Sequence, residues 1–466
     1  MSTYLGIFIS LFFIVIVARL LLKKHNPHAV LLVAGLLMLV IAQLLNYNLP
    51  ALKNDTGFAG FNLFRYIKES FSKTNAGVGL MIMSIGGFVA YIDKIGASKK
   101  LVQVAMKPLK LFKKYPYIAA SMVIPIGQVL FTAIPSAAGL GLLLMASLFP
   151  ILVNLGVSKL SAVSVITAAT AFGIGPASAI TASATTITNI DTIVFFLDYQ
   201  IPLVLPLSLS MMISYYFVNK YFDKKEKEKL KKVEVVIKVK EAEGEKEEKV
   251  EIKTPVIYAL IPVLPILLLI VFSKIFDFFP IPITLDTTTA MFISLFVALL
   301  FELIRIKNIK KVMNSLQVFW NGMGNIFKTV VTLIITADIF AKGLISLGFI
   351  DGLISVAENA GFGAIGIGIV MTIMIFLASM LMGSGNASFF AFGPLIPKIA
   401  KSLGIESSSI ILPMQLSASM GRTVSPVAGV LIATAEIAGV TTLQIVKRNL
   451  IPLTIALIIM LIYHYI

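Results

Sequence analysis

Apolar stretches of about 20 residues recur along this chain of 466 residues, and small polar residues interrupt several of them. A helix needs about 20 mostly apolar residues to cross the hydrocarbon core of a bilayer. The pattern therefore predicts an all-α polytopic membrane protein. The clearest interruption is the sequence MGSGNAS at 382–388, which lies between two strongly apolar segments.

The polar interruptions occur in two pairs, one pair in each half of the chain. We expect helical hairpins near 117–154 and 361–403, with tips at 132–139 and 383–388. We also expect unwound helices at 173–186 and 417–429, where glycine and proline stop the ladder of backbone hydrogen bonds. Unpaired backbone groups are costly in lipid, so such breaks occur where the chain is buried in protein or lines a wet cavity.

The paired interruptions indicate an internal duplication with an offset of about 250 residues. Ser136 and Pro176 in the first half match Asn386 and Pro426 in the second at this offset. We expect a first repeat at 1–221, a charged cytoplasmic linker at 222–254 and a second repeat at 255–466. Each repeat would contain about five transmembrane helices and one re-entrant hairpin. An odd number of crossings would make the second repeat inverted.

Composition and charge agree with this interpretation. Hydrophobic residues make up 58% of the chain and charged residues 13%, and the mean hydropathy is +0.95. The net charge of +16 is concentrated in a few loops beside apolar spans. It therefore indicates membrane topology and contact with anionic lipid, and not a nucleic-acid surface. Because the chain has no cysteine, disulfides and thiolate catalysis are excluded.

Basic loops predict the orientation in the membrane. By the positive-inside rule we expect the cytoplasmic loops to be 23–28, 99–114, the linker, 305–311 and 447–448. The N- and C-termini would then lie outside, and the first span at 4–22 would be retained as a helix.

Arg422 is the candidate that most directly suggests chemistry. A charged residue at bilayer depth is costly and normally faces a cavity or a partner. Its planar fork of donors matches a carboxylate, and half-helix N-termini at the four breaks would also favour an anion. The alternative for Arg422 is a structural ion pair with a buried acid such as Asp338. The alternative for Asn386 and Ser136 is capping of a hairpin tip without ligand contact.

Four longer motifs occur in this order along the chain: GGFVAYIDKIGA (86–97), SAAGLGLLLMASLFPILVNLG (136–156), GSGNASFFAF (383–392) and GRTVSPVAGV (421–430). With these motifs the chain resembles the DcuC-type family of anaerobic C4-dicarboxylate carriers, within the ion-transporter superfamily. The resemblance implies transport of succinate, fumarate or malate by exchange or cation-coupled flux. It also implies an elevator-type arrangement of scaffold and transport domains, a homodimer and a place in the inner membrane. In the stretch GPASAITAS (175–183) the chain lacks the acidic residue of the family, which puts a coupling cation there in doubt.

The resemblance also implies a set of substrate-binding residues. From the second half these are Ser384, Asn386, Ser388, Arg422, Thr423 and Ser425, and the paired elements of the first half add Ser136 and Ser178. No cofactor is expected apart from a coupling Na⁺ or H⁺, and no metal site. The expected partners are the dicarboxylate and membrane lipid. The alternatives are a carrier of another small organic anion or amino acid, or an anion channel. An enzyme is not expected.

Overall fold

The protein was analysed as a computed structural model, which describes residues 2–112, 114–233, 254–273, 283–359 and 363–465. These residues form helices and connecting loops, without a β-strand among them. Nine helices in the described part are long and apolar enough to span a membrane. The expectation of an all-α polytopic membrane protein is therefore confirmed.

The first half consists of helices that end with a long, partly charged one. In chain order they are α1 (Ser2–Leu22), α2 (Pro27–Leu44), α3 (Ala59–Thr74), the π-helix η1 (Asn75–Gly79), α4 (Leu80–Lys94), α5 (Ala97–Ala105), η2 (Lys107–Phe112), α6 (Pro116–Ala133), α7 (Ala137–Asn154), α8 (Lys159–Ala168), α9 (Ala179–Thr188), α10 (Thr192–Val194), η3 (Phe195–Gln200) and α11 (Ile201–Val233). The predicted linker begins within α11, and its residues 234–253 lie outside the described part.

The second half also consists of helices and short helical turns. Its elements are η4 (Val256–Val263), α12 (Leu264–Val271), α13 (Thr287–Ile306), α14 (Ile309–Ser315), α15 (Gln317–Ile326), the π-helix η5 (Phe327–Val331), α16 (Thr332–Ser346), α17 (Phe349–Asn359), α18 (Ala364–Met382), α19 (Gly385–Phe392), η6 (Gly393–Leu395), α20 (Ile396–Leu403), α21 (Ser408–Thr423), α22 (Gly429–Ala438) and α23 (Thr442–Tyr465). Of the hairpin expected near 361–403, residues 361 and 362 lie outside the described part.

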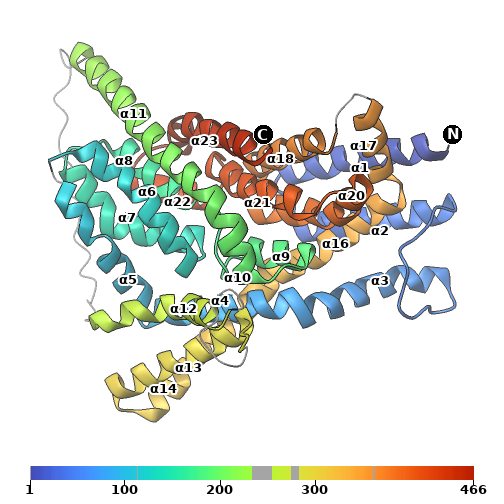
Figure 1. Ribbon diagram of the computed structural model, residues 1–466, viewed down its shortest axis with the longest axis horizontal. Helices are drawn as coiled ribbons and strands as arrows, with labels where there is room; N and C mark the ends of the chain where they lie inside the picture. Colours follow the sequence, from blue (N-terminus) through green and yellow to red (C-terminus); the bar gives the residue numbers. More distant parts are fainter. Residues whose placement is uncertain (1, 113, 234–253, 274–282, 360–362, 466) are drawn as a thin grey trace.

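The two hairpins lie toward opposite ends of the molecule (Figure 1). Helices α6, α7 and α8 occupy one end of its long axis, whereas α17, α18 and α20 lie toward the other. Helices α9 and α21 lie between them. The long run from α3 through η1 to α4 extends along the lower side in this view. One half of each broken helix thus lies between the hairpins.

Small residues allow some helix pairs to approach closely. A Cβ added at Gly421 of α21 would lie 2.2 Å from the carbonyl oxygen of Phe376 on α18. In the same way, a Cβ at Gly35 of α2 would lie 2.7 Å from the carbonyl carbon of Ile339 on α16. Such close backbone contact is typical of packed transmembrane helices. It fixes the end of α21 directly against the second hairpin.

The two breaks differ from those expected from the sequence. The break in the second half is shorter than expected, and the break in the first half begins and ends earlier. Helix α21 continues to Thr423, so Arg422 lies in its last helical turn and not in an unwound stretch. The break covers only 424–428, because Pro426 is the first residue that cannot continue the ladder. In the first half the break covers 169–178, earlier than expected, and α9 is already helical at Ala179.

The tips of the hairpins are also tighter than expected. Ser136 is the N-cap of α7 and Ser384 is the N-cap of α19, so the tips extend only from Ala133 to Ala137 and from Met382 to Gly385. The two serines therefore have the same capping role, at an offset of 248 residues, whereas the sequence-based match paired Ser136 with Asn386 at an offset of 250. Helices α9 and α22 still begin at the predicted offset of 250 residues.

Candidate functional site

The tips of the hairpins rest directly on the two breaks. Gly383 has a φ of +72°, and a Cβ there would lie 2.9 Å from the carbonyl oxygen of Val427 in the second break. Gly175 of the first break has a φ of +96°, and its Cβ would lie 3.0 Å from Cα of Thr132 at the end of α6. Both positions require glycine, because of the left-handed backbone and because of the space. The tip of each hairpin therefore contacts the break in the same half of the chain.

Arg422, in the last turn of α21, contacts the first break and has no acidic partner among the described residues. One terminal nitrogen, Nη2, donates a hydrogen bond to the backbone carbonyl of Thr170 in the first break. Its Nε is buried and has no hydrogen-bond partner in the described part of the chain. The ion pairs found among the described residues do not include Arg422. The guanidinium thus keeps donor capacity that the protein does not use.

The alternative interpretation, an ion pair with Asp338, is not what the structure shows. The carboxylate of Asp338 pairs with Lys342 one turn along α16. It also accepts a hydrogen bond of 2.5 Å from the hydroxyl of Ser70 on α3. Asp338 is therefore satisfied within the α3–α16 contact, and Arg422 is left for another anion.

Two further polar residues lie on the face of α21 that carries Arg422. Gln415, Ser419 and Arg422 are spaced at i, i+4 and i+7, which places them on one side of a helix. The Oε1 of Gln415 and the Oγ of Ser419 are buried without a partner among the described residues. Buried polar atoms are nearly always hydrogen-bonded to protein, water or a ligand. Three unsatisfied atoms on one helical face therefore offer hydrogen bonds to a polar ligand or to water.

The first break is held by glutamines that the sequence analysis missed. Gln415 donates through Nε2 to the carbonyl of Gly173 at 2.8 Å and to Oγ1 of Thr181 at 2.9 Å. Gln200 accepts from the amide of Gly175 at 2.9 Å and donates to Thr181 at 3.0 Å. The sequence did contain a feature that could have identified these residues. Each is a glutamine within an apolar stretch, and its amide needs hydrogen-bond partners when it is buried.

Ser178 stabilises the same break. It is 4% exposed, and its hydroxyl donates to the carbonyl of Gly173 at 3.0 Å. Ser136 of the first hairpin is half-buried and accepts from the amide of Gly139 at 3.0 Å. In the structure both serines therefore satisfy backbone groups, which is the capping role that was the alternative for Ser136.

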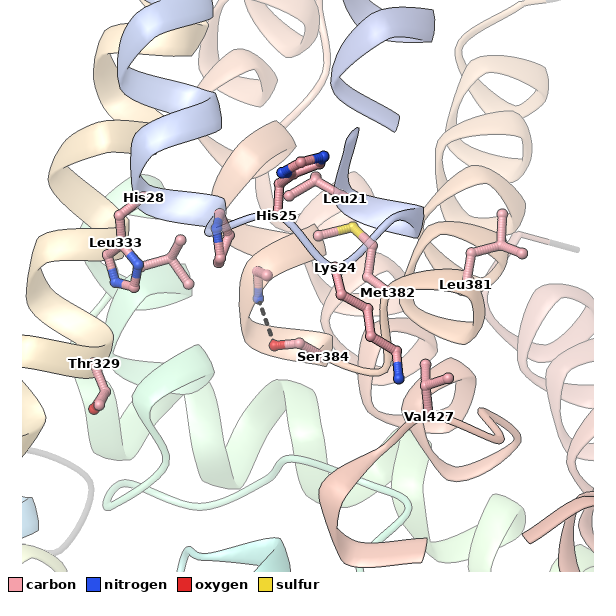
Figure 2. A pocket seen from close by; sticks show the side chains of 12 residues that line it. Leu21, Lys24, His25, His28, Thr329, Leu333, Leu381, Met382, Ser384 and Val427 are labelled. Carbon is pink, nitrogen blue, oxygen red and sulfur yellow. Dashed lines mark hydrogen bonds between the residues drawn. The ribbon is translucent and has the colours of Figure 1, made fainter. Parts of the chain in front are cut away.

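At the tip of the second hairpin, Ser384 and Asn386 differ. Ser384 caps α19 by accepting from the amide of Ala387 at 3.2 Å, a bond drawn in Figure 2. Asn386 is half-buried in the first turn of α19, and the part of the chain that the structure describes gives its side chain no hydrogen bond. Because Ser384 already caps the helix, the amide of Asn386 remains available.

The remaining candidates are fully buried and bonded locally. Ser388 donates to the carbonyls of Ser384 at 3.2 Å and Gly385 at 3.1 Å and contacts the hydroxyl of Ser379. Thr423 donates to the carbonyl of Ser419 at 2.9 Å. Ser425 accepts from the amide of Val427 at 3.4 Å within the second break. Of the eight candidates, Arg422 and Asn386 therefore keep the most unused hydrogen-bonding capacity.

These observations define a class of protein. Nine apolar helices among the described residues, two helical hairpins and two broken helices around an arginine without an acidic partner fit a membrane transporter with an internal anion site.

Comparison with known proteins gives the family. The family model described as C4-dicarboxylate anaerobic carrier, DcuC, matches residues 5–466. The anaerobic C4-dicarboxylate transporter DcuC of Escherichia coli K12 is 33% identical over 463 residues, which cover 99% of this chain and 96% of that protein. A probable anaerobic C4-dicarboxylate transporter DcuC of Vibrio cholerae is 34% identical over 448 residues, covering 96% and 94%. The chain belongs to the DcuC family and is a membrane transporter, not an enzyme.

A more partial match is to a putative uncharacterized transporter of Haemophilus influenzae. It is 36% identical over 135 residues, which cover 28% of this chain and 46% of that protein.

Proposed function

We propose that this protein is a secondary active transporter of C4-dicarboxylates such as succinate, fumarate and malate. The observation that carries the proposal is Arg422, whose guanidinium contacts the first break yet has no acidic partner among the described residues. The names of the E. coli and V. cholerae relatives support the substrate class. A carboxylate of the substrate would take the position that a protein acid occupies in a structural ion pair.

The energetics favour a ligand that carries negative charge. A charge in the bilayer core costs roughly 3 to more than 10 kcal/mol, depending on the reference used. A carboxylate bound to a guanidinium by two parallel hydrogen bonds offsets much of this cost. The unpartnered atoms of Gln415 and Ser419 lie on the same face of α21 and supply further polar contacts. Asn386 would reach the substrate from the tip of the second hairpin.

The transport mechanism is part of the proposal. The similar order of helices in the two halves supports an inverted repeat, with the hairpins as re-entrant elements of a transport domain. This domain would move against a scaffold formed by α1–α4 and α13–α16, as in elevator-type carriers. The substrate would move by exchange or by flux coupled to Na⁺ or H⁺. We further propose a homodimer in the inner membrane, with both termini outside and the linker in the cytoplasm.

Exchange in proteoliposomes tests the proposed function. Vesicles loaded with unlabelled succinate should accumulate labelled succinate, with saturation and with competition by fumarate and malate. Parallel vesicles loaded with an amino acid or a monocarboxylate should not. Accumulation driven only by those compounds would indicate another anion or amino-acid carrier. Large unitary currents without counterflow would indicate a channel.

A further inference from the structure

A polar cavity of about 400 Å³ lies where the turn between α1 and α2 meets the second hairpin. Twelve residues line it (Figure 2): Leu21, Lys24, His25, Pro27, His28, Thr329, Leu333, Leu381, Met382, Ser384, Ala387 and Val427. Lys24 extends toward Val427 in this view, and its ammonium ion forms no ion pair with any described residue. No acid occurs among the described residues that line the cavity. Its chemistry therefore favours an anion.

An apolar cavity of about 250 Å³ adjoins the polar one. It lies between α1, α2, α16, α18 and α19, and its lining is almost wholly apolar, with Leu31, Phe340, Leu377 and Ala378 among the residues that form it. The two cavities share Leu21, Leu381 and Met382. The two cavities therefore adjoin, and together they offer a cationic end and an apolar end.

The apolar cavity is exposed on the outer surface of the helices. Leu377 and Leu381 on α18 are 46% and 49% exposed, at positions that the hydrocarbon of a bilayer would cover. The basic turn at 23–28 belongs to the loops that the sequence predicts on the cytoplasmic side. Such a turn lies at the depth of the lipid headgroups, where a lysine attracts anionic lipid by about 1 kcal/mol.

We propose that this space binds one anionic phospholipid of the membrane. The phosphate headgroup would lie beside Lys24 in the polar cavity, and one acyl chain would enter the apolar cavity beside Ala378. A free dicarboxylate or phosphate would use only the cationic end and leave the apolar cavity empty. The match of a charged end and an apolar end to the two parts of a lipid favours the lipid.

The occupied site would connect two parts of the protein that are separate in sequence. Leu21 and Lys24 come from the α1–α2 region, whereas Met382 and Ser384 come from the tip of the second hairpin. A lipid that contacts both would hold the hairpin against α1. The opening of this hairpin would then depend on the lipid composition of the membrane.

Lipid binding to purified protein tests the proposal without measuring transport. The dissociation constants of phosphatidylglycerol and of phosphatidylcholine with the same chains would be measured by native mass spectrometry. Phosphatidylglycerol should bind more tightly. Lys24→Gln should weaken the binding of phosphatidylglycerol about fivefold, because this is the contribution to affinity of one interfacial lysine. Ala378→Trp should weaken it by about tenfold, because a displaced chain loses at least two buried CH₂ groups.

Two controls distinguish the lipid from a small anion. Lys23→Gln removes the neighbouring charge, which does not line the cavity, and should leave the affinity unchanged. Glycerol 3-phosphate and succinate should neither bind at Lys24 nor displace the lipid. Equal affinity for the two lipids, equal effects of Lys23→Gln and Lys24→Gln, or binding of glycerol 3-phosphate as tight as that of the lipid would each overturn the proposal. If Ala378→Trp does not fold, Ala378→Leu replaces it, and an unchanged affinity would count against the acyl-chain site.

Discussion

Two arginines, Arg448 and Arg422, illustrate two ways in which this fold accommodates a buried cation. Arg448 on α23 is 2% exposed. It pairs with Asp223 at 2.8 Å and with Glu226 at 3.0 Å, both on α11. Arg422 on α21 has one backbone carbonyl as partner and an unpaired Nε in the described part of the chain. Arg448 therefore has two carboxylate partners, although its Nη2 makes no well-directed hydrogen bond, whereas Arg422 has no acidic partner among the described residues.

The carboxylate of Asp223 shows what a complete structural site looks like. It accepts hydrogen bonds from the hydroxyls of Ser158 and Ser161, each at 2.8 Å, and from Tyr117 at 3.0 Å. These residues lie at the beginnings of α6 and α8, so the ion pair links both to α11 and α23. A buried ion pair is tolerated when further hydrogen bonds satisfy its remaining atoms. This cluster therefore has a structural role.

The comparison shows that partners, more than burial, separate a structural cation from a binding one. The sequence predicted Arg422 at bilayer depth and residues 447–448 in a cytoplasmic loop. The second prediction is wrong, because Arg448 lies within α23 and is buried. The acid opposite Arg448 comes from a residue more than 200 positions earlier in the chain. The missing acid opposite Arg422 can therefore be recognised only from the packed structure. The predictions below test this distinction from the largest expected effect to the smallest.

Arg448→Ala should cause the largest loss of stability. The change leaves Asp223 as a buried, unpaired charge, a situation that costs about 3–5 kcal/mol. Thermal or denaturant unfolding in detergent measures it. As a control, the double change Asp223→Leu with Arg448→Met removes both charges and should recover much of the loss. If the Arg448→Ala variant is as stable as the unchanged protein, the structural role of Arg448 is contradicted.

Arg422→Ala should have its main effect on transport and little on folding. Removing one partner of a desolvated charge pair costs about 2–5 kcal/mol in binding, or about 30-fold or more in affinity. Uptake of labelled succinate into proteoliposomes should fall accordingly. Stability should change by less than about 1 kcal/mol, because no acid loses its partner. Arg422→Lys should also be strongly impaired, because an ammonium ion lacks the planar fork. Normal uptake by the alanine variant would remove Arg422 from the site.

Asn386→Ala should weaken substrate binding by about fivefold, the usual value of one neutral hydrogen bond. The tip of the hairpin should stay folded, because Ser384 caps α19. A thermal-shift titration with succinate gives both affinity and stability. If affinity is unchanged while stability falls, the amide serves the tip and not the ligand.

Ser388→Ala provides the matched control on the same helix, two residues further along. Its hydroxyl is fully buried and bonded to Ser384, Gly385 and Ser379. We expect a loss of about 1 kcal/mol of stability and less than about twofold change in succinate affinity. An affinity loss as large as that of Asn386→Ala would mean that the hydroxyl turns toward the ligand during transport.

Much of the helical architecture could be predicted from the sequence. Apolar length predicted membrane-spanning helices, and glycine, proline and serine located both hairpin tips to within a few residues. The breaks expected at 173–186 and 417–429 overlap the observed breaks at 169–178 and 424–428, but their bounds differ by up to eight residues. The boundaries were less accurate, because residues such as Arg422 are compatible with a helical turn until Pro426 ends the ladder.

Long-range partners were not predictable in this way. The bonds of Gln415 to Gly173 and of Gln200 to Thr181 depend on how α21 and η3 pack against the first break. Likewise, Ser178, Ser388 and Thr423 carry hydroxyls of the expected type, yet these donate to local backbone carbonyls. Sequence reveals which side chains can contact a ligand, and only the fold reveals which are already occupied.

The most direct test of the central claim is equilibrium binding of succinate to purified Arg422→Met, measured by calorimetry beside the unchanged protein. Methionine keeps much of the length and apolar stem of arginine but offers no charge or donors. The account predicts a dissociation constant at least about 30-fold higher, with an unfolding temperature close to that of the unchanged protein. An unchanged dissociation constant in the folded variant would contradict the claim that Arg422 receives the carboxylate.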